Sequence, residues 1–308
     1  MKIFILDPLH PAGVEYAARH FETVRWDDPR VKHWPDEADA LMVRMTRVAA
    51  ADIARAKRLR IISKQGVGYD TVDVAAAKKH GIVVCRTPGV NSDAVAEIAL
   101  ALGLCAARRV TELDRRIRAG DKFTRPDVLA IETLGKTVGV IGVGNIGSRV
   151  ARKWTAAFDA RVIGYDPYVT KLVCEKVEKL DDLLRAADLV TLHVPLNDET
   201  RHMIGAREIA LMKKSAILVN TCRGGVVDEA ALYAAMKSGH LFGAGLDVWE
   251  DVEPPSMHHP LLSLPNVIAT PHVAGNTFET QERSALWVAQ QAVDFLQGKA
   301  PSPANRVA

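Results

Sequence analysis

Short apolar runs alternate with stretches of helical periodicity along almost the whole chain. The runs predict buried strands at Lys2–Leu6, Ala40–Val43, Arg60–Ser63, Gly81–Cys85, Thr137–Ile141, Arg161–Tyr165, Leu189–His193, Ala216–Asn220, Gly243–Asp247 and Val267–Ala269. The periodic stretches predict helices that include Ala12–His20, Ala50–Ala56, Val72–His80, Asn145–Phe158, Leu180–Ala187 and Asp228–Ser238. Because strands that alternate with helices form βαβ units, the sequence predicts an α/β fold with parallel sheets.

Two longer helical patterns bear on the domain organisation. The first, Ala94–Ala119, is apolar nearly all round in its first half, so we expect that half to be buried between layers or against another subunit. Its second half is rich in arginine, which we interpret as a solvated end favoured by the helix dipole rather than a nucleic-acid contact. The second, Thr277–Gln297, follows the last predicted strand and could return to cover the first part of the chain.

Composition excludes several classes of protein. The chain has 308 residues, of which 48% are hydrophobic and 25% charged, so it can bury a core without metal or disulfide support. A net charge of +3 gives no global attraction to nucleic acid or to a membrane, and we expect neither partner. The four cysteines follow no zinc or disulfide spacing, and the longest apolar stretch is too short for a membrane span, so we expect a cytoplasmic protein without a metal site. The adjacent His258 and His259 are interpreted as loop residues.

A glycine-rich turn predicts a dinucleotide site. Residues 137–147 read as a strand that runs into G-x-G-x-x-G and then a helical pattern. In this motif Gly142 suits the tight turn, Gly144 the approach of a pyrophosphate, and Gly147 close packing of helix on strand. The N–H groups at the start of the following helix would face the phosphate charge.

The next predicted strand ends in an acidic residue, Asp166, 19 residues after Gly147. A carboxylate at this place accepts hydrogen bonds from the adenosine ribose and repels a 2′-phosphate. Pro167 and Tyr168 stand where NADP enzymes often place arginine. The pattern therefore predicts NAD as the cofactor.

Three side chains suited to hydride-transfer chemistry lie after predicted strands. His272 follows a strand and a proline, Arg223 follows a strand and is flanked by glycines, and Glu253 precedes Pro254. Reduction of a ketone needs a proton donor that titrates near neutral pH and a cation to hold a carboxylate. Ligands bind at the carboxyl ends of parallel strands, where these residues are expected to lie.

At these positions the sequence resembles the D-isomer-specific 2-hydroxyacid dehydrogenases, of the type of phosphoglycerate dehydrogenase or hydroxypyruvate reductase without a regulatory domain. The resemblance rests on motifs spread in order along nearly the whole chain: G-V-G-Y-D at 66–70, T-P-G at 87–89, A-V-A-E at 94–97, the glycine turn up to 147, H-V-P at 193–195, N-T-C-R-G at 220–224, G-L-D at 245–247 and T-P-H at 270–272. It implies two doubly wound domains: a flavodoxin-like substrate domain, 1–98 plus 282–308, and an inserted Rossmann NAD-binding domain, 99–281. It also implies a homodimer built through the region of 94–119.

The resemblance assigns roles to individual residues. It implies that Arg223, Glu253 and His272 are catalytic, and that Arg44, Val67 and Gly68 bind substrate, the last two through their main-chain N–H groups. The cofactor-binding residues that it implies are Gly142, Gly144, Asn145, Ile146, Gly147, Asp166, His193, Val194, Pro195, Thr221, Cys222, Arg223, Asp247, His272 and Gly275. Asp247 is expected at the nicotinamide amide, and His193 is expected to border the cofactor through its backbone.

The acid-bearing loop departs from the family pattern. The family runs D-V-[FYW]-x-x-E-P, whereas residues 247–254 read D-V-W-E-D-V-E-P, with one extra residue. Glu250 and Asp251 are therefore rivals of Glu253 as the partner of His272. We favour Glu253 because it precedes proline and lies 19 residues before the histidine.

The function predicted from these residues is NAD-dependent oxidation or reduction between a small 2-hydroxy acid and its 2-keto acid. Hydroxypyruvate, glyoxylate and 3-phosphoglycerate types of substrate remain open at this stage, as does the physiological direction. The alternative is a non-catalytic NAD(H)-sensing protein on the same scaffold, since a fold does not determine a function. A relative acting on formate or phosphite is a further possibility, although the carboxylate expected beside His272 disfavours formate.

Overall fold

Two all-parallel β-sheets organise the computed structural model, which describes residues 1–308. The sheets belong to two units, Met1–Asn91 with Asn276–Ala308 (unit 1) and Ser92–Gly275 (unit 2). The domain boundaries predicted from the sequence fall a few residues after both of these junctions. The predicted α/β class with two parallel sheets is confirmed.

Unit 1 contains a five-stranded sheet in the order β2-β1-β3-β4-β5, which is the flavodoxin-like order. Its strands are β1 (Lys2–Ile5), β2 (Glu22–Val24), β3 (Ala40–Val43), β4 (Ile61–Lys64) and β5 (Val83–Cys85). Its helices are α1 (Pro11–Ala18), η1 (Pro29–His33), α2 (Trp34–Glu37), α3 (Ala50–Arg55), α4 (Val74–Lys79) and α11 (Phe278–Leu296).

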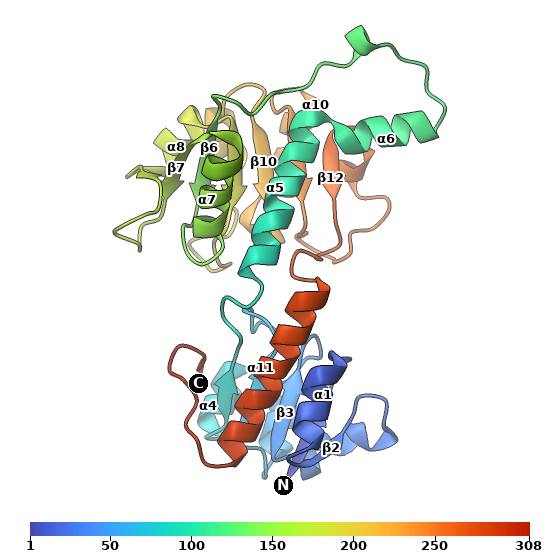
Figure 1. Cartoon of the computed structure of the whole chain (residues 1–308), viewed down its shortest axis with the longest axis vertical. Helices are drawn as coiled ribbons and strands as arrows, with labels where there is room; N and C mark the ends of the chain where they lie inside the picture. The colour runs from blue at the N-terminus through green and yellow to red at the C-terminus, as the bar shows by residue number, and fades with distance from the viewer. The chain divides into compact units, whose positions relative to one another are not determined.

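The C-terminal helix α11 is part of unit 1, where it lies beside α1 on one face of the sheet (Figure 1). The two helices approach closely at Gly13, where a Cβ atom would lie 2.4 Å from the carbonyl oxygen of Ala285. Ser63 of β4 donates a hydrogen bond to the Val288 carbonyl at 3.0 Å. The last helix of the chain therefore completes the hydrophobic core formed by the first strands and helix α1.

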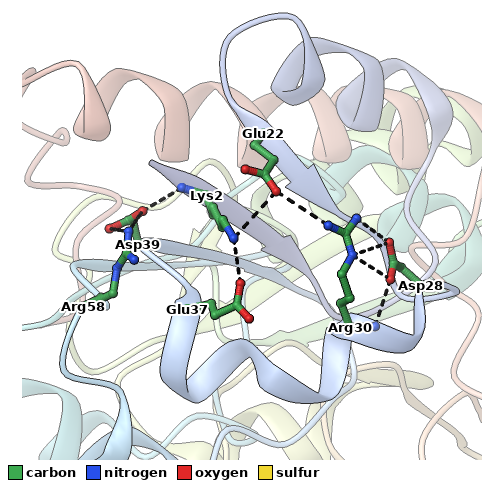
Figure 2. Close-up of polar contacts among 7 residues, drawn as sticks. All are labelled: Lys2, Glu22, Asp28, Arg30, Glu37, Asp39 and Arg58. Atoms are coloured by element: carbon green, nitrogen blue, oxygen red, sulfur yellow. Dashed lines mark hydrogen bonds and ion pairs between the residues drawn. The ribbon is translucent and has the colours of Figure 1, made fainter.

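Charged side chains surround the start of β1 (Figure 2). The Asp39 carboxylate, 10% exposed, accepts the Lys2 main-chain N–H at 2.7 Å and pairs with Arg58 at 3.1 Å. The hydrogen bond between the Lys2 ammonium and Glu37 raises the pKa of Lys2 and lowers that of Glu37. Since most members of this network are exposed to solvent, screening keeps their contribution to stability small.

Unit 2 contains a seven-stranded sheet in the order β12-β11-β10-β9-β6-β7-β8, which is the Rossmann order with one added strand. Its strands are β6 (Thr137–Ile141), β7 (Arg161–Tyr165), β8 (Glu175–Lys176), β9 (Leu189–Leu192), β10 (Ile217–Asn220), β11 (Gly243–Leu246) and β12 (Val267–Ala269). Its helices are α5 (Ser92–Arg108), α6 (Val110–Arg118), η2 (Arg125–Asp127), α7 (Gly147–Phe158), α8 (Leu180–Ala186), α9 (Ala206–Leu211), η3 (Gly224–Val226), α10 (Glu229–Lys237) and η4 (Pro260–Ser263).

Both faces of this sheet are covered, which explains why its strands read as continuous apolar runs. Helices α5 and α7 pack on one face around the fully buried Trp154 (Figure 1). Helices α8, α9 and α10 pack on the other face through residues that include Leu183 and Leu232. None of the helices combines the length and the apolar composition that a membrane span needs.

The prediction of one continuous helix over 94–119 is wrong. The chain forms α5 and α6, separated at Arg109, whose φ of 53° is left-handed. The Arg109 guanidinium donates to the buried carboxylate of Glu112 at 2.6 and 2.8 Å, which holds the reversed residue in place. The break depends on the pairing of Arg109 with Glu112, and helical periodicity cannot predict such a pairing.

Candidate active site

The glycine turn between β6 and α7 has the shape that the motif predicts. Gly142 has a φ of +83°, and a Cβ atom there would lie 2.6 Å from the carbonyl oxygen of His193. A Cβ atom on Gly147 would lie 2.0 Å from the carbonyl oxygen of Gly142, so helix and strand meet without room for a side chain. Around Gly144, in contrast, there is open space within 4 Å. The turn thus leaves backbone accessible before the start of α7, which fits a dinucleotide pyrophosphate.

Asp166 lies directly after β7 and faces the same turn. One carboxylate oxygen accepts the Val143 N–H at 2.9 Å, and the other accepts the N–H groups of Tyr168 and Val169 at 2.9 and 3.1 Å. The side chain is 8% exposed. Tyr168 is exposed and donates its hydroxyl to Glu199 at 2.5 Å. Negative charge therefore gathers at this end of the turn.

The loop after β9 contains His193, Val194 and Pro195. Burial lowers the pKa of His193 to about 3, so the imidazole is neutral at physiological pH. Its Nε2 is hydrogen-bonded to the Thr191 hydroxyl at 2.9 Å, and its main-chain N–H donates to Ile141 at 2.8 Å. These contacts give His193 a structural role beside the glycine turn, and they leave the predicted backbone contact with the cofactor as a prediction.

The loop after β10 is shaped by Asn220, which is not among the site residues predicted from the sequence. Its side chain accepts from the Cys222 N–H at 3.1 Å and donates to the Arg223 carbonyl at 2.9 Å. Burial raises the pKa of the Cys222 thiol to about 11, so this thiol is not a nucleophile near neutral pH. The buried Thr221 hydroxyl has no hydrogen-bond partner in the protein, which fits its predicted contact with a bound group.

Glu253 and His272 form a hydrogen-bonded pair through carboxylate Oε2 and imidazole Nδ1. The other carboxylate oxygen accepts the Trp249 N–H at 3.1 Å. Burial acts to raise the pKa of Glu253, but the His272 and Trp249 hydrogen bonds and the charge of Arg223 outweigh it, so the net pKa is lowered. Glu253 is thus ionised, and it holds the imidazole of His272 through Nδ1.

The rival carboxylates lie elsewhere. Glu250 is paired with the imidazole of His202, and Asp251 is exposed. Of the three candidates, Glu253 is the one that the structure places against His272.

A buried carboxylate holds the loop that carries His272. This histidine has a φ of 55°, and its N–H donates to the Asp247 carbonyl at 2.7 Å. The Asp247 carboxylate, 0% exposed, accepts the N–H groups of Val273 and Ala274, both at 2.9 Å. Since such a backbone conformation persists only when its surroundings enforce it, Asp247 fixes the histidine loop in the structure. Its predicted contact with the nicotinamide amide stays a prediction.

Arg223 and Glu253 belong to loops whose backbones touch. A Cβ atom on Gly224 would lie 1.9 Å from the carbonyl carbon of Trp249 and 2.4 Å from the Glu250 nitrogen. Only glycine permits this approach. The Arg223 guanidinium in turn donates to the Cys222 carbonyl at 2.7 Å, which fixes the side chain to its own loop.

Of the predicted substrate-binding residues of unit 1, Arg44 is held by a second buried carboxylate, Asp7. Its oxygens accept the main-chain N–H groups of Arg44, Met45 and Thr46 at 2.5 to 3.2 Å. The Arg44 guanidinium donates to Asn276 at 3.3 Å. The main-chain N–H groups of Val67 and Gly68 make no hydrogen bond within the protein, so they can donate hydrogen bonds to an anion.

Comparison with known proteins identifies the family. The family model described as D-isomer specific 2-hydroxyacid dehydrogenase, NAD binding domain, matches residues 100–274, more than half of the chain. The chain belongs to this family. The match covers the glycine turn and the three residues predicted to be catalytic, all of which lie in unit 2. It confirms the predicted family, and with it the class of NAD(P)-binding oxidoreductase.

Full-length relatives extend the likeness beyond that domain. The glyoxylate reductase of Aeropyrum pernix is 41% identical and aligns with 97% of this chain and 94% of its own length. The D-3-phosphoglycerate dehydrogenase of Methanocaldococcus jannaschii is 42% identical, but the chain spans only 58% of that protein. The crystal structure of TT0316 protein from Thermus thermophilus has a TM-score of 0.90 at 37% identity, with 100% of both chains covered.

Proposed function

We propose that this chain is an NAD-dependent 2-keto acid reductase, acting reversibly as a D-2-hydroxyacid dehydrogenase. The proposal rests on the hydrogen-bonded Glu253–His272 pair, with the Arg223 charge close enough to lower the pKa of the carboxylate. A bound nicotinamide supplies the hydride in reduction and accepts it in oxidation. The three side chains supply the proton and the positive charge that the substrate needs.

In the reducing direction, the protonated imidazole of His272 gives the proton on Nε2 to the carbonyl oxygen of the keto acid. The Glu253 carboxylate holds the proton on Nδ1 and stabilises the imidazolium charge before transfer. Arg223 pairs with the substrate carboxylate through its planar fork of donors. In the oxidising direction the same imidazole, now neutral, removes the hydroxyl proton.

Substrate recognition is also proposed for unit 1. The unpartnered N–H groups of Val67 and Gly68 suit a carboxylate, and Arg44 offers a second positive charge. Relatives are named as glyoxylate reductase and hydroxypyruvate reductase, the latter from Thermotoga maritima at 44% identity over 89% of this chain. We therefore propose a small 2-keto acid such as glyoxylate or hydroxypyruvate as the substrate, with 3-phosphoglycerate as the competing type.

We propose NAD rather than NADP because of the negative charge at the end of β7. The buried Asp166 carboxylate stands beside the glycine turn, and Tyr168 brings the carboxylate of Glu199 to the same region. A 2′-phosphate would meet this charge without a nearby arginine on the β7 loop. A solved relative, an imino acid reductase at 29% identity, is described in complex with NADPH, so cofactor choice varies within this fold.

A homodimer is proposed through the region of α5 and α6. Large apolar side chains there are exposed to solvent in the single chain, among them Val110 and Ile117 at 52% and 67%. Exposed apolar side chains concentrated in one segment mark an association surface. Sedimentation analysis that finds a monomer at micromolar concentration would contradict the dimer.

The proposed activity is tested by NADH oxidation against a panel of 2-keto acids, repeated with NADPH. We expect turnover of glyoxylate or hydroxypyruvate, a preference for NADH, and a loss of at least about 10²-fold in kcat in His272→Ala with NADH binding retained. Binding of NADH by the wild type without turnover of any keto acid would favour the alternative, an NAD(H)-sensing protein. A preference for NADPH would reject the role proposed for Asp166.

A further inference from the structure

A second carboxylate–histidine pair adjoins the loop that carries Glu253. Glu229, the first residue of α10, accepts the Glu250 N–H through one carboxylate oxygen at 2.9 Å. Its other oxygen is hydrogen-bonded to the imidazole Nε2 of His259, also at 2.9 Å. The two side chains are mostly buried, with 12% of Glu229 and 23% of His259 exposed. Neither residue belongs to the catalytic set.

The His259 ring connects this pair to Trp249. The two rings meet edge to face at 71°, with their centroids 5.2 Å apart. The other imidazole nitrogen, Nδ1, is buried without a hydrogen-bond partner. The single polar contact of the ring is therefore the one to Glu229, and that contact determines how the ring lies against the indole.

Trp249 contacts both loops of the catalytic pair. Its main-chain N–H donates to Glu253 Oε1 at 3.1 Å, and its indole N–H donates to the Thr270 carbonyl, also at 3.1 Å. Thr270 lies two residues before His272 in the same loop. The Trp249 side chain is 3% exposed, so it cannot move without disturbing its neighbours.

We propose that Glu229 and His259 are positioning residues, which hold Trp249 in the place where it orients Glu253 and His272 for proton transfer. This inference rests on the proposed function for its effect on turnover. Its effect on Glu253 itself does not depend on turnover. If Trp249 shifts, the carboxylate loses an N–H donor and the histidine loop loses the hydrogen bond at Thr270.

The charged groups around the Glu229–His259 pair favour a fixed position for both side chains. Glu229 faces His259 and the Glu250 carboxylate, and Glu250 faces His202. Burial raises the pKa of Glu229, with the Glu250 N–H and His259 acting in the opposite direction. Glu253 faces His272 and Arg223. The two carboxylates thus have separate histidine partners, and a change at His259 reaches Glu253 through Trp249.

Neighbouring histidines provide a matched pair of variants. His259→Phe keeps an aromatic ring against Trp249 but removes the hydrogen bond to Glu229. His258→Phe is the control, because His258 is exposed and its polar contact to Ser256 is made by the main chain. Glu229→Gln is a second test if His259→Phe does not fold, since the amide keeps the size of the carboxylate and removes its charge.

The first readout is the titration of Glu253 in the free protein, followed by NMR with carboxyl-¹³C-labelled glutamate and assigned with a Glu253→Gln spectrum. We expect the pKa of Glu253 to rise by about half a unit to one unit in His259→Phe, because an N–H donor to the carboxylate is weakened. We expect no change in His258→Phe. Equal titration of Glu253 in the two variants would overturn the proposal.

The second readout is turnover. We expect kcat for the best keto acid to fall about tenfold or more in His259→Phe, with the KM for NADH unchanged, because misplacement of a catalytic group acts on the chemical step. Wild-type turnover in His259→Phe would contradict the positioning role. A wild-type protein that turns over no keto acid would reject the proposed function, while the Glu253 titration would still decide whether His259 positions the carboxylate.

Discussion

Gly224→Ala is the substitution that most directly tests the contact between the loops that carry Arg223 and Glu253. The added methyl would lie 1.9 Å from the Trp249 carbonyl carbon, 2.0 Å from its oxygen and 2.4 Å from the Glu250 nitrogen. All three are backbone atoms, so no side chain can rotate away. Since carbon atoms in contact lie about 3.5–4.0 Å apart, the two loops must separate by about 1.5 Å.

This separation has consequences for stability and for activity. Forced overpacking of this kind costs about 1–3 kcal/mol, and we expect urea unfolding to show a loss of that size. The same movement withdraws the Trp249 N–H from Glu253 and moves Glu253 relative to Arg223. We expect kcat/KM for the keto acid to fall about 10²-fold, which is the effect of misplacing catalytic groups by about 1 Å.

The adjacent glycine is the control. A Cβ atom on Gly225 would lie 3.4 Å from the Arg201 guanidinium and 3.4 Å from a methyl of Leu196, so both neighbours are side-chain atoms at ordinary contact distance. We expect Gly225→Ala to retain wild-type turnover and to unfold within about 0.5 kcal/mol of wild type. If Gly224→Ala behaves like Gly225→Ala in both assays, the close approach of the two loops has no functional importance and the reasoning is refuted.

Two further predictions concern buried polar groups of unit 2. Burial lowers the pKa of His193 from 6.5 to about 3, so the folded state excludes a proton that the unfolded chain binds below pH 6.5. The stability of the folded state is therefore full at pH 7.5 and falls as the pH drops toward 3. Between pH 7.5 and pH 5, the free energy of unfolding measured with denaturant should fall by about 2 kcal/mol more in wild type than in His193→Gln. An equal fall in the two proteins would contradict a buried neutral imidazole. Asp247→Asn places an amide N–H₂ against the N–H of Val273 or Ala274. We expect the variant to be destabilised by about 1–3 kcal/mol and to turn over substrate more slowly. An unchanged unfolding midpoint would show that the carboxylate is not needed to hold the histidine loop.

The central strands of both sheets could be predicted well because each is buried on two faces. A strand such as β6 or β9 reads as an uninterrupted apolar run, and its neighbours supply the same pattern. The strands β2 and β8 could not be predicted in this way, since they are short edge strands of three and two residues that are only partly buried. Their pairing depends on the neighbouring strand rather than on their own composition.

Helix ends that depend on a distant or charged partner were harder to predict from the sequence. Helix α5 ends where Arg109 adopts a left-handed conformation, and nothing in the periodicity of that stretch interrupts the helix. The reversal is held by a buried ion pair with Glu112. A local pattern reports which face of a helix is apolar, but it does not report which of several arginines turns back to a buried carboxylate.

The residues of the site also divide into those that a local sequence pattern predicts and those whose roles depend on contacts between distant segments. Arg223 and His272 could be singled out because each follows a strand directly and carries suitable chemistry. Glu229, His259 and Trp249 could not, because their roles appear only when three separate segments come together. From the sequence alone His259 is interpreted as a loop residue, and the structure gives it a buried carboxylate partner.

The order of strands explains why one extra residue in the acid-bearing loop leaves the hydrogen-bonded Glu253–His272 pair intact. Arg223, Glu253 and His272 follow β10, β11 and β12, which are neighbours in the sheet. Parallel strands end at one edge, so even loops of different length begin side by side. Of the three loops, the one after β11 is the longest before its proposed catalytic residue. Two hydrogen bonds hold its middle, one from Glu250 to His202 and one from the Glu250 N–H to Glu229. The added residue falls between Trp249 and Glu253, where the family pattern has two residues and this chain has three, and Trp249 and Thr270 still bring the carboxylate to the imidazole.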